Sequence, residues 1–254
     1  SAYTAGIATQ LRLWSNDNYG EDLVIAPRGG GIYYWQPDGT YTNGVLAGLS
    51  TRAQLLQTLA DSAIATTTSA SFILGATTIT VTSSSGITVG SLVTGTNIAA
   101  GTRVTVVAGT SVTISNATTG ASAGSYSFSY AGQYVPSATN QVVASSIQRF
   151  VIAFGANSYI SGTPSTTFNP MLVRWSDQNN PYQWVPDVTN QAGEFALTNG
   201  SYIMAARSTR QEILVWTDSA IYSMQYLGAP YVWGFQILMA VSYTHLRAHE
   251  TRED

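Results

Sequence analysis

Three segments of the chain repeat one pattern, in which an apolar run, a polar turn and a second, more aromatic run follow one another. The paired runs are 23–26 with 32–35, 150–154 with 171–175, and 213–216 with 221–226. Strand-forming residues bounded by Gly, Pro, Asn, Asp and Ser predict a β-hairpin in each segment. The runs are nearly continuous in apolar residues, which favours strands covered on both faces, as in propeller blades and sandwich cores.

Residues 67–131 have a different composition. They are almost entirely Thr, Ser, Gly, Ala and Val, and Arg103 is their only charged residue. Short strand-like runs alternate with turns, at 78–82, 103–107, 111–115 and 125–130, and residues 108–110 read as a hairpin loop. We predict a small β-sandwich or barrel module inserted into a host domain. Without it, the three hairpins lie roughly 63 residues apart, which indicates a repeat.

One helix is expected just before this module. Residues 50–61 begin with Ser and Thr, contain good helix formers and place apolar residues at 55, 56 and 59. The fold class predicted is therefore all-β. It comprises a partial β-propeller-like host, formed by 1–66 and 132–240, and the inserted module at 67–131.

The end of the chain has a different origin in our interpretation. Val241–Thr251 resembles the translation of a transposase-based sequencing adapter, so we expect 241–254 to be non-native read-through and the protein to be a fragment ending near Met239. Both histidines, His245 and His249, fall in this stretch, and their i, i+4 spacing is therefore not taken as a metal site.

The remaining 240 residues restrict the chemistry. They contain 8 Arg, 10 acidic residues and no Lys, His or Cys. This composition excludes Ser-His and Cys-His nucleophiles, histidine-ligated zinc and disulfides, and leaves carboxylate chemistry or oxygen-ligated calcium. No apolar run approaches the 18 or so residues of a membrane span. No basic patch favours wrapping of nucleic acid.

Two short polar stretches are predicted to form turns rather than ligand-binding loops. Asn16–Asp22 is rich in oxygen ligands but lacks the spacing of a calcium loop, so it predicts an Asx-rich turn before a strand. Pro27–Gly31 has no phosphate-loop Lys and predicts a hairpin turn that carries an exposed Arg28.

The densest polar and aromatic cluster spans 174–186. Its rings Trp175, Tyr182 and Trp184 could stack on a sugar whose hydroxyls bind Asp177 and Gln178.

Two other interpretations of this cluster are open. Asp177 could pair with Asp187 or Glu194 as glycosidase carboxylates. Alternatively, the cluster joins two blades, with Trp filling a gap while Asp and Gln hold the loop backbone. We favour the packing interpretation because large aromatics mostly serve packing.

Several stretches together resemble a group of bacteriophage proteins. They are 14–24, 27–35, 174–178, 190–193, 212–222 and 228–235. In their order along the chain they look like the tail hub or nozzle proteins of short-tailed phages, also called packaged-DNA stabilisation proteins. The resemblance implies a β-propeller body that assembles as a ring below the portal and forms part of the DNA exit channel.

The expected function follows from this resemblance. The chain would be a structural virion protein of the tail, not an enzyme, with no cofactor. Its partners would be its own copies in a ring, other tail or portal proteins, and DNA that passes without sequence-specific binding. The candidate structural and interface residues are Trp14, Arg28, Trp35, Arg174, Trp175, Asp177, Gln178, Trp184, Trp216 and Trp233. The alternative is a tail-spike-type carbohydrate-binding protein or glycosidase.

Overall fold

The computed structural model describes residues 13–37, 52–62, 66–129, 132–160 and 163–240. The stretch 241–254, with His245 and His249, lies outside these residues. The described chain forms the strands β1–β18, one α-helix and one 3-10 turn, and all of these strands belong to four antiparallel sheets. The all-β prediction is therefore confirmed.

Three of the sheets are four-stranded meanders whose strand order follows the chain. Sheet 1 contains β1 (Trp14–Tyr19), β2 (Asp22–Pro27), β3 (Tyr33–Trp35) and β4 (Gln54–Leu55). Sheet 2 contains β11 (Thr139–Ser145), β12 (Phe150–Ile160), β13 (Thr163–Trp175) and β14 (Gly193–Ala196). Sheet 3 contains β15 (Ile203–Ser208), β16 (Ile213–Thr217), β17 (Ala220–Gly228) and β18 (Val232–Ala240). Four antiparallel strands in chain order are the arrangement of a propeller blade.

The three predicted hairpins are confirmed as the two middle strands of these sheets. They are β2–β3, β12–β13 and β16–β17. The polar stretch 16–22 is mostly strand, because only Gly20 and Glu21 form the turn between β1 and β2. The prediction of a turn over that whole stretch was therefore too broad. Its Asp22 accepts a hydrogen bond from the hydroxyl of Tyr34.

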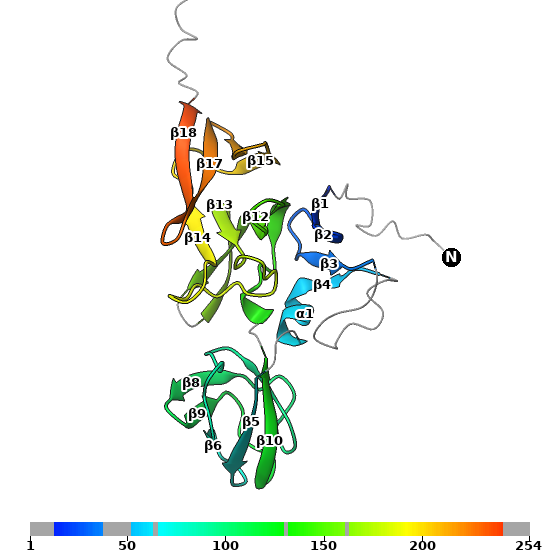
Figure 1. Ribbon diagram of the computed structural model, residues 1–254, viewed down its shortest axis with the longest axis vertical. Helices are drawn as coiled ribbons and strands as arrows, with labels where there is room; N and C mark the ends of the chain where they lie inside the picture. The colour runs from blue at the N-terminus through cyan, green and yellow to red at the C-terminus, as the bar shows by residue number, and fades with distance from the viewer. Residues whose placement is uncertain (1–12, 38–51, 63–65, 130–131, 161–162, 241–254) are drawn as a thin grey trace, which may run out of the picture.

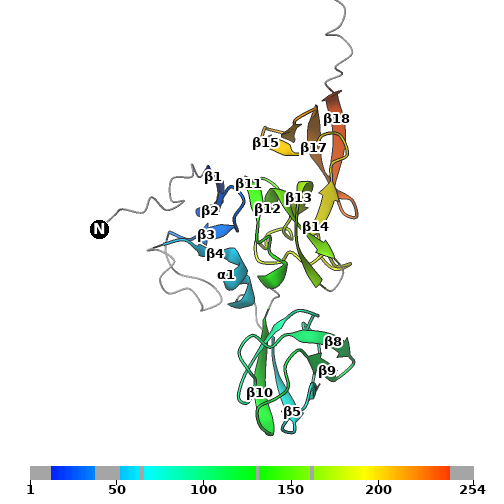
Figure 2. The same ribbon diagram turned by 180° about the vertical axis from the view of Figure 1, so that it is seen from behind.

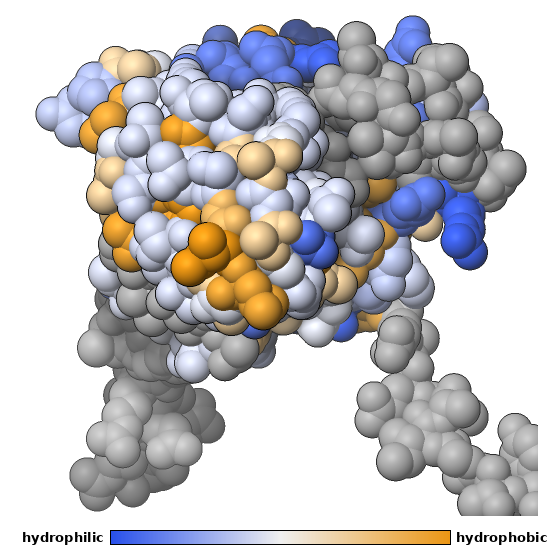
Figure 3. Space-filling model, turned by 90° about the horizontal axis from the view of Figure 1, so that it is seen from below, coloured by the Kyte–Doolittle hydropathy of each residue, from blue (hydrophilic) through white to orange (hydrophobic). Residues whose placement is uncertain are grey.

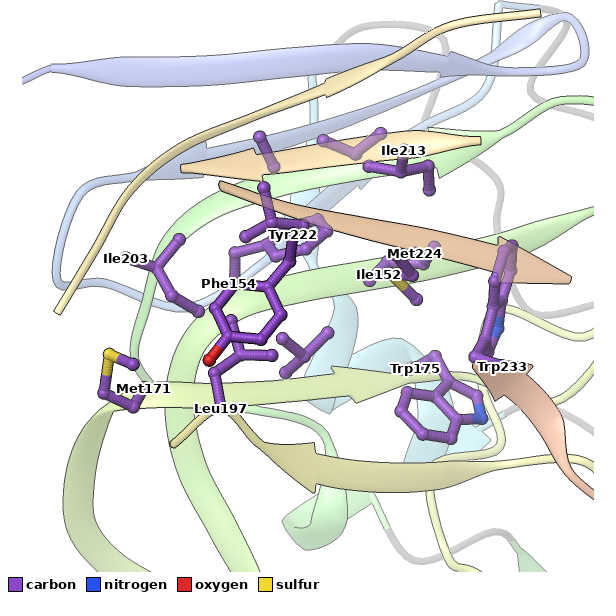
Figure 4. Packing of buried hydrophobic residues seen from close by; sticks show 14 of the residues in the cluster. Ile152, Phe154, Met171, Trp175, Leu197, Ile203, Ile213, Tyr222, Met224 and Trp233 are labelled. Carbon is purple, nitrogen blue, oxygen red and sulfur yellow. The ribbon is translucent and has the colours of Figure 1, made fainter. Parts of the chain in front are cut away.

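Sheet 2 lies between sheets 1 and 3 and is buried on both faces. In β12, Val151 and Ala153 belong to the core shared with sheet 1. The alternate residues Phe150, Ile152 and Phe154 belong to the core shared with sheet 3. Figure 4 labels Ile152 and Phe154 in this core. Full burial of such a side chain stabilises the fold by about 1.5–3 kcal/mol, which explains the unbroken apolar run of this strand.

The first strands of sheets 1 and 2 are joined by side chains. The hydroxyl of Ser15 accepts a hydrogen bond of 2.9 Å from the amide of Val142. The carboxylate of Asp17 accepts one of 3.0 Å from the amide of Ala144. These two β1 side chains therefore satisfy edge amides of β11 that have no partner strand on that side.

Residues 66–129 form a separate six-stranded sheet of order β7-β10-β5-β6-β9-β8. Its strands are β5 (Thr66–Phe72), β6 (Thr78–Val81), β7 (Leu92–Thr94), β8 (Val104–Ala108), β9 (Ser111–Ile114) and β10 (Ser122–Ser129). The sheet curls, because Val104 at one edge bonds to Ser91 and Gly90 beside the other edge, at 2.9 and 2.7 Å. It encloses its own hydrophobic cluster, which includes Ile79 and Phe128. We call this unit the inserted module.

The predicted hairpin within the module is confirmed. Its strands β8 and β9 pair from Val104–Ile114 to Ala108–Ser111, and Gly109 in the loop has φ +58°. Strands β5 and β7 were not among the predicted runs. Strand β5 pairs with β10 along its whole length. Thr66 and Phe128 therefore lie side by side, where the chain enters and leaves the module.

The predicted helix is present as α1 (Leu56–Ser62), and it is shorter than predicted. The predicted start at residue 50 lies outside the described residues, and Gln54–Leu55 form strand β4 instead. Pairing of these two residues with Tyr34 and Tyr33 replaces the first helical turn. Because Leu56 and Leu59 are buried in the core with sheet 2, the helix is held by tertiary packing rather than by its length.

The module lies beyond α1, at the opposite end of the molecule from sheet 3 (Figures 1 and 2). Asp61 of α1 forms the junction. Its carboxylate pairs with Arg103 of the module at 2.7 Å and accepts the amide of Gly132, in the 3-10 turn η1 (Gly132–Tyr134), also at 2.7 Å.

The lower face of the molecule carries apolar side chains among polar ones (Figure 3). In the module, Ile73 and Leu74 follow β5 and are 74% and 67% exposed.

Candidate functional site

Arg174 is the centre of the 174–186 cluster and lies inside the protein. It extends from β13, is only 2% exposed, and donates to the carbonyl oxygens of Tyr134 at 2.7 Å, Asn157 at 2.9 Å and Trp184 at 3.2 Å. Its Nε lies 3.5 Å from the carboxylate of Glu194. Burial lowers the pKa of Arg174 to about 10, and Glu194 opposes that shift. The side chain is therefore a buried cation at neutral pH that ties three backbone segments together.

The aromatic residues of this cluster are buried as well. Trp175, Tyr182 and Trp184 are 6%, 3% and 2% exposed. The indole of Trp175 donates to Gln191 O, and that of Trp184 donates to Pro181 O, both at 2.8 Å. No broad ring face is left open for a sugar, so the geometry favours the packing interpretation over sugar stacking here.

Asp177 and Gln178 organise the loop after β13. One oxygen of Asp177 accepts the amides of Gln178 and Gln191, both at 2.8 Å. The side chain of Gln178 donates to Gln148 O at 3.2 Å and accepts from the side chain of Gln191 at 3.0 Å. Both candidates therefore hold backbone and loop geometry.

The two carboxylates considered as partners of Asp177 have similar structural contacts. Asp187 accepts the amide and hydroxyl of Thr189, at 2.9 and 2.7 Å, and these bonds lower the pKa of its carboxyl. Glu194 accepts the amide of Tyr159 at 2.7 Å and the hydroxyl of Ser158 at 2.8 Å. Such contacts explain both acids without a reaction.

The other candidate tryptophans occupy different environments. Trp233 is 6% exposed and packs edge-on against Phe150 and Tyr226, with ring centroids 5.5 and 5.4 Å apart. Trp35 and Trp216 are half-buried on sheets 1 and 3. Trp14 is 57% exposed at the start of β1.

Trp14 and Arg28 line a groove where the first strands of all three sheets meet. Strand β11 contacts β1 on one side and β15 on the other. The groove has a volume of about 350 Å³, and its other lining residues include Asn140, Met204 and Arg207. We call it the first-strand groove.

The floor of this groove is held in place by Gln141. Its side-chain amide donates to Ala206 O at 2.7 Å and its oxygen accepts Ala206 N at 2.8 Å. One β11 side chain thus satisfies both backbone groups of a β15 residue, as a neighbouring strand would.

Sequence reasoning named Trp14 and Arg28 but missed Asn140, Gln141 and Arg207. Asn140 and Gln141 lie in β11, and Arg207 lies in β15. Both are the strands that precede a predicted hairpin, and the sequence patterns did not predict these strands. No group of three His, Cys, Asp or Glu that could hold a metal occurs among the described residues. In the same part of the chain, no helix is long and apolar enough to cross a membrane.

Comparison with protein-family models and with curated proteins finds no match to this sequence.

Proposed function

We propose that the protein is a structural component of a tailed-phage virion, a tail hub, nozzle or connector subunit that assembles around the genome exit channel. The observation that carries the proposal is the row of three blade-like sheets, with adjacent first strands tied by Ser15, Asp17 and Gln141. Together with the resemblance of the sequence stretches, this rigid construction supports a scaffold role. The residues that look most reactive, such as Arg174 and Asp177, serve packing and loop geometry.

The outer faces of the end sheets support assembly with copies of the same chain. On sheet 3, Trp216, Ile221 and Met239 form a cross-strand apolar row, and Met239 is 59% exposed. On sheet 1, Ile25 and Tyr33 alternate with buried core residues and so point away from sheet 2. Two different apolar faces at opposite ends of the row suit head-to-tail contacts, which close into a ring when the rotation permits.

The test is the oligomeric state of the full chain. Light scattering after size-exclusion chromatography and negative-stain microscopy are expected to show a closed ring. Trp216→Asp should dissociate it, whereas Ile147→Asp, at a 73% exposed position in the turn between β11 and β12, should not.

A monomer at all concentrations would overturn the ring. Cleavage of a polysaccharide by the protein, lost in Asp177→Asn, would replace the structural role with the glycosidase alternative. A portal or terminase gene beside the coding sequence would independently support the proposal.

A further inference from the structure

The described lining of the first-strand groove contains two arginines and no acidic residue. Arg28 follows β2 and Arg207 lies in β15, and both are exposed. The two ion pairs formed among the described residues belong to Arg103 and Arg174. In a chain with more acidic residues than Arg, two guanidinium groups that form no ion pair with any described carboxylate give this groove a local positive charge that would attract an anion.

The rest of the lining suits a ring with hydroxyl groups. Trp14 presents an exposed indole, and aromatic faces pack on flat apolar surfaces. The side chains of Asn16 and Asn140 carry amides that both donate and accept hydrogen bonds. The groove, at about 350 Å³, lies at the small end of the range of ligand pockets.

We propose that the first-strand groove binds an acidic sugar of the uronic-acid class. The carboxylate of the sugar pairs with Arg28 and Arg207, its ring packs on Trp14, and its hydroxyls bond to Asn16 and Asn140. A carbohydrate site is thus placed at the groove and not at the buried rings Trp175, Tyr182 and Trp184. The inference goes beyond the proposed structural function, and neither depends on the other.

A nucleic-acid strand is the less favoured ligand. Its binding depends on many phosphate contacts, and the groove offers two cations on a protein of net negative charge. A single carboxylate needs no more than a pair of guanidinium groups, because one guanidinium can already bind it through two parallel hydrogen bonds.

The test compares two ligands that differ only in the acid group, D-glucuronate and D-glucose, by saturation-transfer NMR and calorimetry on the full chain. Glucuronate should bind about tenfold more tightly than glucose. Arg28→Gln and Arg207→Gln should each remove that preference. Arg210→Gln, at an exposed arginine outside the groove, is the matched control and should keep it.

The aromatic contact has its own pair of variants. Trp14→Ala should weaken glucuronate binding by about tenfold, and Trp14→Phe, which keeps a flat face, should largely restore it. The melting temperature of each variant should match that of the parent protein, because the substitutions change exposed side chains.

Three results would overturn the proposal. The first is no binding of glucuronate at roughly 10 mM. The second is displacement of glucuronate by an equal concentration of acetate, which would reveal a bare anion site. The third is tighter binding of an oligothymidylate that depends on the same residues, which would make the groove a nucleic-acid contact.

Discussion

Replacing Arg174 tests whether the 174–186 cluster is structural. Arg174→Ala removes the donors of three buried carbonyl bonds, to Tyr134, Asn157 and Trp184, and the cation beside Glu194. Removing one partner of a buried ion pair costs about 3–5 kcal/mol. The ion-pair part is reduced here, because Glu194 is 24% exposed and lies 3.5 Å away.

The net magnitude combines opposing effects. Each unsatisfied buried carbonyl costs about 1–3 kcal/mol, and the truncated side chain leaves a cavity. The desolvation cost of the guanidinium, visible in its lowered pKa, disappears in the variant and offsets part of the loss. We therefore expect Arg174→Ala to lower the free energy of unfolding by about 4 kcal/mol.

Two further variants separate the causes. Arg174→Met keeps much of the volume and should cost about 3 kcal/mol, mostly from the carbonyls. Arg174→Lys keeps the charge but not the forked donors and should cost about 2 kcal/mol. The exposed Arg210→Ala is the control, with an expected change within about 0.5 kcal/mol.

The assay is equilibrium unfolding in urea, followed by tryptophan fluorescence and circular dichroism. A loss of less than about 1 kcal/mol in Arg174→Ala would refute the packing argument. The same conclusion would follow if Arg174→Ala and Arg210→Ala were indistinguishable.

Three other predictions concern the junction, the module and acid stability. Gly132→Ala should destabilise the host by about 2 kcal/mol or more in urea unfolding, because the new Cβ would lie 2.0 Å from Gln57 O. The control is Gly124→Ala, whose Cβ would meet no atom within 4 Å and which should be nearly neutral. Deleting 66–129 and joining its flanks should leave a cooperative calorimetric melt of the host; an insoluble product would show that the module is part of the host core. Hydrogen bonds lower the pKa of Asp187 and Asp218 below the ordinary 3.8, so their stabilisation is present above that pH and is lost as pH falls through the folded-state values. The melting temperature of the double Asn variant should therefore fall less between about pH 5 and about pH 3 than that of the parent, and equal falls would contradict the assignment.

The sequence patterns predicted the hairpins because their central strands are strongly apolar. Strand β12 is the clearest example, since burial on both faces requires an unbroken apolar run. Strand β1 was missed because Asn16, Asp17 and Asn18 favour turns when considered locally. Its pairing with β2 and the bond from Asp17 to β11 override that preference.

The buried role of the 174–186 cluster was anticipated, whereas the first-strand groove was not. The cluster is one continuous stretch of sequence, so its density of polar and aromatic residues is visible before folding, although Arg174 and Gln178 bind distant residues such as Tyr134 and Gln148. The groove joins Arg28, Asn140 and Arg207 from three sheets, and their proximity depends on how those sheets pack. Helix α1 shows the same limit, because the strand pairing of Gln54–Leu55 sets where it starts.

The bonds between the first strands also bear on solubility. An open strand edge can recruit another chain and begin aggregation. In this protein Ser15 and Asp17 occupy amides along β11, and Gln141 occupies both backbone groups of Ala206 in β15. Polar side chains therefore stand in for a partner strand at inner edges that a foreign strand could otherwise extend. The three sheets can in this way lie side by side in one chain while their facing edges stay closed to strands of other molecules.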